Sequence, residues 1–374
     1  MLKNEKLSYP PEENDKNYYE HINTDYLHSL NENIISFLDT YYFRSRFIGF
    51  EEMPQRNEPS TPLIYASNHS GMSFPWDAII FVGGLFKKSH SSIHDSVRAL
   101  TAPALSASKY MSPYMIDNFW RRTGGVDATL QNFDTMMRFP DSNVLIYPEG
   151  IAGIGKGFDR RYELQQLSTS FIRMAIKYKT DIIPISVVNG EYSNPYSYKS
   201  DELNKLVQKL GIPYLPLGPI SAMVPFGPFS FYMAMPAKLT FVMGNRIKIY
   251  EMTDRPLEKL KKKELHHLRD VVYQQMQEEL DSALAIYGKD PYHFEELGDI
   301  WRDNLDRMLY ILPSGWPLLF HEHERWFQTS GYRREKMPHG NAAFVEALIK
   351  NPMILSFTLP LIGWPALLKW KRVI

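Results

Sequence analysis

Hydrophobic residues follow two different spacings along the chain as far as residue 287. Short apolar runs bounded by turn residues predict buried strands. These runs occupy residues 62–67, 97–101, 143–147, 181–188, 239–242 and 246–249, the last two flanking a Gly244-Asn245 turn. Apolar positions three and four apart predict helices over residues 26–47, 164–178 and 257–287, and another that starts at Pro75. This alternation predicts an α/β fold with a mainly parallel central sheet flanked by helices.

The two ends of the chain differ from this central part. Residues 1–20 are polar, lack the apolar core of a signal peptide and predict a solvated tail. An amphipathic helix over about residues 24–47 then opens a domain that we expect to span residues 21–287. Residues 288–374 are rich in aromatic residues and proline without strand–helix alternation, which indicates a C-terminal extension.

Two uncharged stretches, residues 210–237 and 353–368, suggest contact with lipid. Six prolines interrupt the first and two interrupt the second, so neither is expected to form a straight membrane-spanning helix. The second stretch leads into Lys369-Trp370-Lys371-Arg372, a basic and aromatic end typical of segments that lie in a membrane interface. Buried core loops and a packed C-terminal tail are the alternative interpretation.

Composition removes several classes of function. Lys plus Arg equals Asp plus Glu at 42 each, so no overall positive field is available to bind nucleic acid. The chain has no cysteine, which excludes thiolate nucleophiles and cysteine-based zinc sites. His321-Glu322-His323 lacks the ligand spacing of a metal site, and we interpret these residues as structural.

The first candidate for chemistry is residues 67–77, Ser-Asn-His-Ser-Gly-Met-Ser-Phe-Pro-Trp-Asp, directly after a predicted strand. Strand ends are where α/β proteins place reactive groups. His69 could remove a proton from an alcohol at neutral pH if a carboxylate orients its ring, and Asp77 is the nearest carboxylate. Asp77 could equally be there to stabilise the first turn of the helix that begins at Pro75.

The second candidate is residues 147–157, Tyr-Pro-Glu-Gly-Ile-Ala-Gly-Ile-Gly-Lys-Gly, also at a strand end. A glycine-rich turn can present backbone amides to an anion, and Lys156 adds charge. The spacing from Gly150 to Lys156 matches the start of the phosphate-binding loop of nucleotide hydrolases. Position 157 is Gly where that loop requires Ser or Thr, which argues against a hydrolase.

Taken in order, four blocks resemble the glycerolipid and lysophospholipid acyltransferase family over about residues 45–285. They are Asn68-His69, residues 122–126, Pro148-Glu149-Gly150 and residues 182–185. Residues 161–164, 171–173, 187–191 and 210–216 resemble a diverged branch related to monoacylglycerol acyltransferases. One departure is that Phe74 stands where the family has its Asp, and seven residues separate His69 from Asp77. Related branches also carry a later acid after a Pro, and Ile151 replaces the usual Thr.

The resemblance implies transfer of a fatty acyl group from an acyl thioester, either acyl-CoA or acyl carrier protein, to a hydroxyl of a glycerolipid or lysophospholipid. It implies His69 as the general base with Asp77 as its partner, and no cofactor beyond the thioester co-substrate. The implied substrate-binding residues are Arg122, Glu149, Gly150, Lys156 and Arg161. It further implies a peripheral or monotopic protein on the cytoplasmic face of a membrane. The alternative is a lipid-binding protein of the same fold that has lost catalysis.

Overall fold

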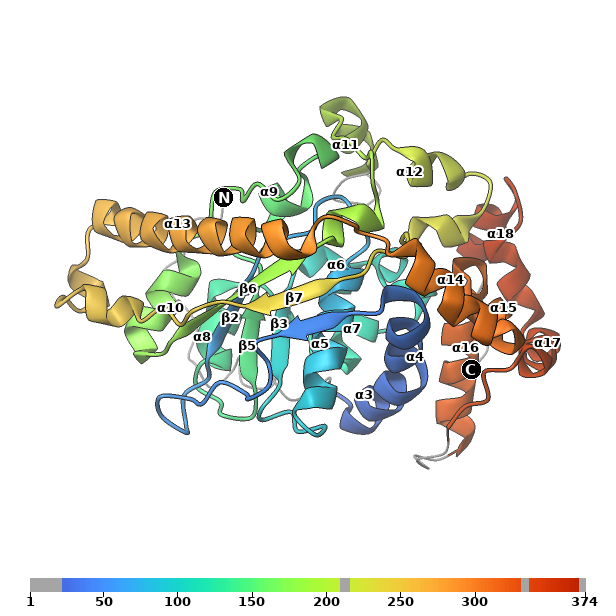
Figure 1. Ribbon diagram of the computed structural model, residues 1–374, viewed down its shortest axis with the longest axis horizontal. Coiled ribbons are helices and arrows are strands. Elements are labelled where there is room, and N and C mark those ends of the chain that lie inside the picture. The colour runs from blue at the N-terminus through green and yellow to red at the C-terminus, as the bar shows by residue number, and fades with distance from the viewer. Residues whose placement is uncertain (1–21, 209–215, 331–335, 370–374) are drawn as a thin grey trace.

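A seven-stranded sheet runs through the centre of the computed structural model, which describes residues 22–208, 216–330 and 336–369 (Figure 1). The strand order is β1-β7-β6-β2-β5-β3-β4. Every neighbouring pair is parallel except β6 and β7. This arrangement confirms the predicted α/β class with a mainly parallel sheet. The strands are β1 Arg46–Ile48, β2 Ile64–Ser67, β3 Val97–Thr101, β4 Val126–Asp127, β5 Asn143–Ile146, β6 Ile182–Val188 and β7 Thr240–Met243.

Helices cover both faces of the sheet, so the central strands are buried on both sides. In β2, Tyr65 belongs to one hydrophobic cluster and Ile64 and Ala66 to the other. The helices of the central region are α3 Thr24–Leu30, α4 Ser36–Leu38, α5 Trp76–Lys88, α6 Pro103–Ala107, α7 Phe119–Arg122, α8 Leu130–Met136, α9 Ile151–Ile154, α10 Ser170–Tyr178, α11 Asp201–Gln208, α12 Pro219–Met223 and α13 Lys262–Tyr287. Helices α3, α4 and α5 contribute to the first cluster, and α8, α10 and α13 to the second.

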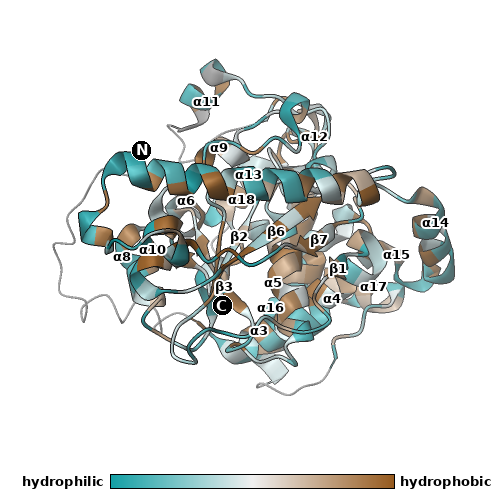
Figure 2. Cartoon of the chain, turned by 60° about the vertical axis from the view of Figure 1, so that its left-hand side comes forward, coloured by the Kyte–Doolittle hydropathy of each residue, from teal (hydrophilic) through white to brown (hydrophobic). Residues whose placement is uncertain are grey.

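Figure 2 shows how hydropathy follows this layering. Hydrophobic colour concentrates on α5 and on the strands, whereas α13 alternates between hydrophilic and hydrophobic residues. The buried residues of α13, including Leu268, Val272 and Met276, recur three or four positions apart. Helix α13 therefore turns one face to the sheet and the other to solvent, as its periodicity predicted.

The C-terminal extension packs as helices onto the face of the sheet that carries α3 and α5. It comprises α14 Phe294–Asp303, α15 Met308–Ile311, α16 Trp316–Ser330, α17 Asn341–Lys350 and α18 Gly363–Lys369. Trp316 of α16 is fully buried and meets Trp76 of α5 at 5.0 Å between ring centroids. The extension thus shares a hydrophobic core with the central region. Across the described residues, no helix combines the length and hydropathy needed to cross a bilayer.

Four sequence-based expectations differ from the structure, and one of them is that the long helix expected from residue 257 begins only at Lys262. Residues 246–249 are not a strand: only Ile247 pairs, through an isolated antiparallel bridge to Ile182. The helix expected from residue 164 begins at Ser170, because residues 164–168 form no regular element and the Ser168 amide donates to the carbonyl of Pro148. The N-terminal helix ends at Phe43 with two π-helical turns, and β1 follows it. The predicted polar tail, residues 1–20, lies outside the described residues.

Candidate active site

Three adjacent strands bring their carboxyl ends to one edge of the sheet. Strand β2 pairs in parallel with β5 on one side and with β6 on the other. The loops that follow, residues 68–75, 147–150 and 189–194, therefore start side by side. Both candidate segments from the sequence, around His69 and around Glu149, lie at this edge, where the His69 amide donates to the Glu149 carboxylate.

The backbone around His69 is tied to both neighbouring strands. The Asn68 side-chain amide donates to the Val187 carbonyl at 3.2 Å and accepts from the Val187 amide at 2.7 Å. The His69 amide donates to Oε1 of Glu149 at 2.7 Å. The partly buried imidazole stacks on Tyr147, with 4.5 Å between ring centroids. Within the described part of the chain, no residue hydrogen bonds to either ring nitrogen of His69.

Glu149 acts as a brace between two loops. Its Oε1 accepts from the His69 amide, and its Oε2 accepts from the Gln165 amide at 2.6 Å. The carboxylate is buried, and burial raises its pKa despite the opposing charge of Lys156. Gly150 follows with φ +57°, a conformation that favours glycine, and starts α9.

Glycine at position 153 allows α9 to approach this brace closely. A Cβ there would lie 2.6 Å from Cβ of Glu149 and 2.9 Å from Cδ2 of His69. Both distances are well inside van der Waals contact. The glycine-rich sequence after Glu149 therefore lets α9 pack directly on the histidine.

Asp77 lies in the first turn of α5, where it is buried and accepts a hydrogen bond from Ser70 Oγ at 2.7 Å. Burial raises its pKa, although the Ser70 hydrogen bond works in the opposite direction. No hydrogen bond joins Asp77 to the His69 ring among the described residues. Ser70, which sequence reasoning missed, directly follows His69 and thus connects the Asp77 carboxylate to the loop that carries His69. It packs so tightly on Gly190 that a Cβ at Gly190 would lie 2.0 Å from its Oγ.

A buried ion pair lies behind the histidine loop. Lys156 Nζ is 3.3 Å from Oε1 of Glu191, and both side chains are almost fully buried. The same Oε1 accepts from the Tyr162 amide at 3.1 Å. Glu191 is a second residue of this region, after Ser70, whose contacts the sequence did not predict. Burial, and secondarily the positive charge of Lys156, lower the pKa of His69 to about 3. The imidazole is therefore neutral at physiological pH.

The two arginines predicted to bind substrate lie elsewhere. Arg122, on α7, donates to Oε2 of Glu324 at 2.9 Å, and its guanidinium carbon lies 3.5 Å from the ring centre of Tyr26. It therefore joins the N-terminal helix to the C-terminal extension. Arg161 is exposed and lies over the Phe158 ring at 4.8 Å. The structure brings together His69, Asp77, Glu149, Gly150 and Lys156 but records neither arginine in contact with them.

A hollow of about 470 Å³ opens beyond the carboxyl end of β3. Seven of its eight lining residues are of polar or charged type, two of them cationic, and none of the five clustered residues belongs to it. The lining residues are Ser106, Ser108, Lys109, Ser112, Asp117, Asn118, Trp120 and Arg121.

Comparison with known proteins finds one matching family model and several similar proteins. Residues 44–188 match the family model described as Acyltransferase. The uncharacterized protein Rv0502 of Mycobacterium tuberculosis is 24% identical over 215 residues, which cover 57% of this chain and 55% of that protein. The uncharacterized protein ML2427 of Mycobacterium leprae is 25% identical over 207 residues, which cover 55% and 51%. The match thus spans about half the length of these curated relatives.

Among solved structures, the 1-acyl-sn-glycerophosphate (LPA) acyltransferase PlsC from Thermotoga maritima superposes with a TM-score of 0.35 and 13% identity. The alignment covers 67% of this chain and 81% of that protein.

Proposed function

We propose that the protein transfers a fatty acyl group from an acyl thioester to a hydroxyl of a glycerolipid or lysophospholipid, because residues 44–188 match the family model described as Acyltransferase. His69 is the general base in this proposal. The observation that carries it is the placement of His69: its backbone is fixed by β5 and β6, while its ring nitrogens have no partner among the described residues. An imidazole held in this way can receive a proton from a bound substrate.

The reaction needs no protein nucleophile. The acceptor hydroxyl gives its proton to an imidazole nitrogen of His69 while its oxygen attacks the thioester carbonyl carbon. The tetrahedral intermediate then expels the thiolate, which takes the proton back from the imidazolium, and the ester product remains. Direct transfer of this kind agrees with a chain that has no cysteine. The thioester is the co-substrate, as acyl-CoA or acyl carrier protein, and no further cofactor enters the scheme.

The electrostatics set the protonation state of the imidazole before the reaction starts. A base must be unprotonated before it accepts a proton, and a pKa of about 3 keeps His69 neutral throughout the physiological range. Glu149 fixes the main chain of His69 rather than its ring. Asp77 acts through Ser70 on the same loop. In this proposal Glu149 and Asp77 position the base, and Gly150 and the α9 turn shape the acceptor side of the site.

A specific observation favours a second candidate. Phe74 occupies the position of the family's usual Asp, and Asp77 makes its hydrogen bond to Ser70 instead of the imidazole. A lipid-binding protein of the same fold without catalysis would also fit these two features.

Thiol release from labelled acyl-CoA, measured over a panel of lysophospholipid, monoacylglycerol and diacylglycerol acceptors, separates the candidates. A general base contributes roughly 10²–10⁴-fold to rate, so His69→Ala should lose at least about 100-fold in turnover. His267→Ala, an exposed histidine on α13, is the matched control and should keep full activity. Wild-type turnover in His69→Ala would refute the base assignment. Lipid binding without transfer to any acceptor by the unmodified protein would favour the second candidate.

A further inference from the structure

Two uncharged segments that are far apart in the sequence form one continuous surface. Residues 217–226 and 351–368 contain no Asp, Glu, Lys, Arg or His. The Leu361 amide donates to the Pro225 carbonyl at 2.9 Å, and Trp364 Nε1 donates to the Val224 carbonyl at 3.1 Å. Helices α12 and α18 accordingly lie next to each other in Figure 1.

Each segment has an anchored side and an exposed side. Ile220, Ile354, Phe357 and Leu367 are buried and hold the segments on the protein. Nine large apolar side chains of the two segments are exposed, among them Phe226 at 64%, Leu361 at 71% and Ile362 at 63%. We name as the apolar ridge six of these nine residues: Met223, Phe226, Leu359, Leu361, Ile362 and Leu368. Exposed apolar side chains that gather on one surface mark an interaction site, whereas scattered ones do not.

The backbone at the ridge is strained as well as exposed. Leu361 has φ +58°, a left-handed conformation that is uncommon for a residue with a side chain. The turn that holds it presents Leu361 and Ile362 together at its tip. Local strain of this kind costs stability and is concentrated at sites that bind something. Neither exposed side chain contributes to the buried core.

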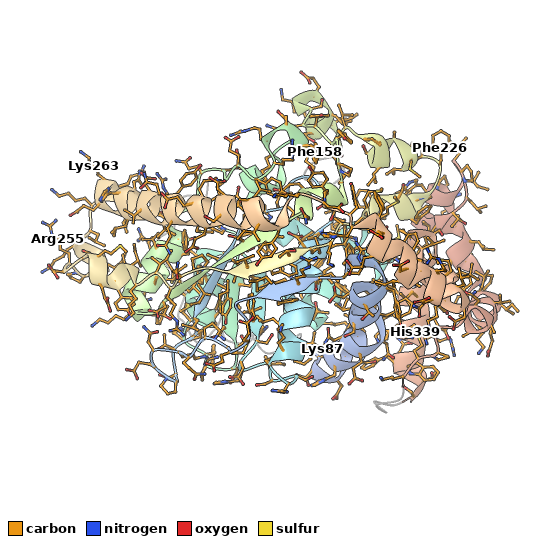
Figure 3. All side chains as sticks on the ribbon, in the orientation of Figure 1. Lys87, Phe158, Phe226, Arg255, Lys263 and His339 are labelled. Atoms are coloured by element: carbon orange, nitrogen blue, oxygen red, sulfur yellow. The ribbon has the colours of Figure 1, made fainter. Side chains whose placement is uncertain are left out.

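Main-chain hydrogen bonds connect the ridge to the loop that carries Lys156. Leu217, just before α12, pairs with Tyr198 through two 2.9 Å hydrogen bonds. The Ser197 carbonyl in turn accepts from the Phe158 amide at 2.9 Å, and Phe158 follows Lys156 by two residues. Phe158 and Phe226 lie along the same edge of the molecule in Figure 3. A flat partner resting on the ridge would therefore extend toward the loop that carries Lys156 and Phe158.

We propose that the apolar ridge docks the protein on an anionic lipid bilayer, so that the acyl acceptor reaches His69 from the membrane. The direction of acceptor entry rests on the proposed function; the docking itself does not. Charge identifies the occupant, because the exposed Lys369 ends α18 directly after Leu368 and the sequence continues Trp370-Lys371-Arg372. Apolar residues beside cations and Trp match a membrane interface with acidic headgroups.

The test is co-sedimentation of the full chain with vesicles of phosphatidylcholine and phosphatidylglycerol. The double variant Leu361→Asp/Ile362→Asp should bind these vesicles at least about tenfold more weakly, because two side chains lose their burial in the acyl region. The matched control is Met252→Asp/Ile286→Asp, which changes two exposed apolar residues outside the ridge, 49% and 67% exposed. It should bind like the wild type. Equal circular-dichroism melting of all three proteins shows that folding is retained.

Three results would overturn the proposal. One is vesicle binding by Leu361→Asp/Ile362→Asp that equals that of the wild type. Another is a wild-type protein that does not bind these vesicles. The third is a wild-type dimer in size-exclusion chromatography with light scattering that the ridge variant dissociates, since the ridge would then join two copies of the chain. Failure of the proposed function is a separate outcome, because His69→Ala should lose turnover while binding vesicles normally.

Discussion

Replacing Gly153 with alanine tests the packing of α9 on the histidine without removing any reactive group. The new Cβ would lie 2.6 Å from Cβ of Glu149, 2.9 Å from its Cδ and 2.9 Å from Cδ2 of His69. Ordinary carbon–carbon contacts lie at about 3.5–4.0 Å, so these groups must separate by roughly 0.6–1 Å. Movement of Glu149 also loosens its 2.7 Å hydrogen bond to the His69 amide.

The size of the effect follows from that displacement. A misplacement of about 1 Å at a reacting group costs roughly 100-fold in rate. Overpacking of a well-filled region costs typically about 1–3 kcal/mol of stability. We therefore expect Gly153→Ala to fold, to melt at a lower temperature and to lose about two orders of magnitude in kcat.

The assay compares Gly153→Ala with Gly155→Ala in thiol release under saturating substrate. A Cβ at Gly155 meets only the Ile151 carbonyl oxygen, at 3.1 Å, and no side chain of the site. Gly155→Ala should therefore stay within a few-fold of wild type. The reasoning is wrong if folded Gly153→Ala turns over as fast as Gly155→Ala, since the imidazole position would then not limit the reaction.

Two further predictions concern buried ionisable side chains. Lys156→Met leaves the Glu191 carboxylate buried without its cation and should lower the free energy of unfolding by about 3–5 kcal/mol. The double variant Lys156→Met/Glu191→Gln should lose less unfolding free energy than Lys156→Met alone. Urea unfolding measures both variants, and equal losses would contradict a coupled pair. Burial lowers the pKa of His323 from 6.5 to about 3, so its contribution to stability is complete above pH 6.5 and is lost as the pH falls toward 3. From pH 6.5 to 5 the loss amounts to about 2 kcal/mol. His323→Gln, which can keep the contact to Ser29, should show a smaller loss of unfolding free energy between pH 7 and pH 5, and an unchanged slope would refute the assignment.

Where the sequence predicted the fold correctly, the signal was local. The runs at residues 143–147 and 181–188 contain strands buried on both faces, so their continuous apolar character can be recognised in a single sequence. Strand β4 has two residues and β1 has three, too few for any periodicity to identify them. The stretch around Ile247 is apolar in alternation but pairs only through one bridge.

In the candidate site too, residues beside predicted strands could be found from the sequence, whereas contacts between distant residues could not. His69 and Glu149 follow strands that the pattern predicts, and parallel neighbours bring their ends together. The partner of Arg122 could not be predicted, because Glu324 lies 202 positions away on a helix of the extension. Ser70 carries no periodic signal, and its role depends on Asp77 and Gly190 meeting it in space.

The geometry also explains why the two short motifs belong together. Asn68 bonds to the main chain of β6 through both ends of its amide, and the amide of His69 bonds to the carboxylate that follows β5. One dipeptide therefore fastens its loop to both neighbouring strands through two independent sets of hydrogen bonds. The glutamate uses its second oxygen on the Gln165 amide, so it fixes the two loops at once. Because these bonds involve the main chain of His69, three strands position its imidazole, and its ring nitrogens have no hydrogen-bond partner among the described residues.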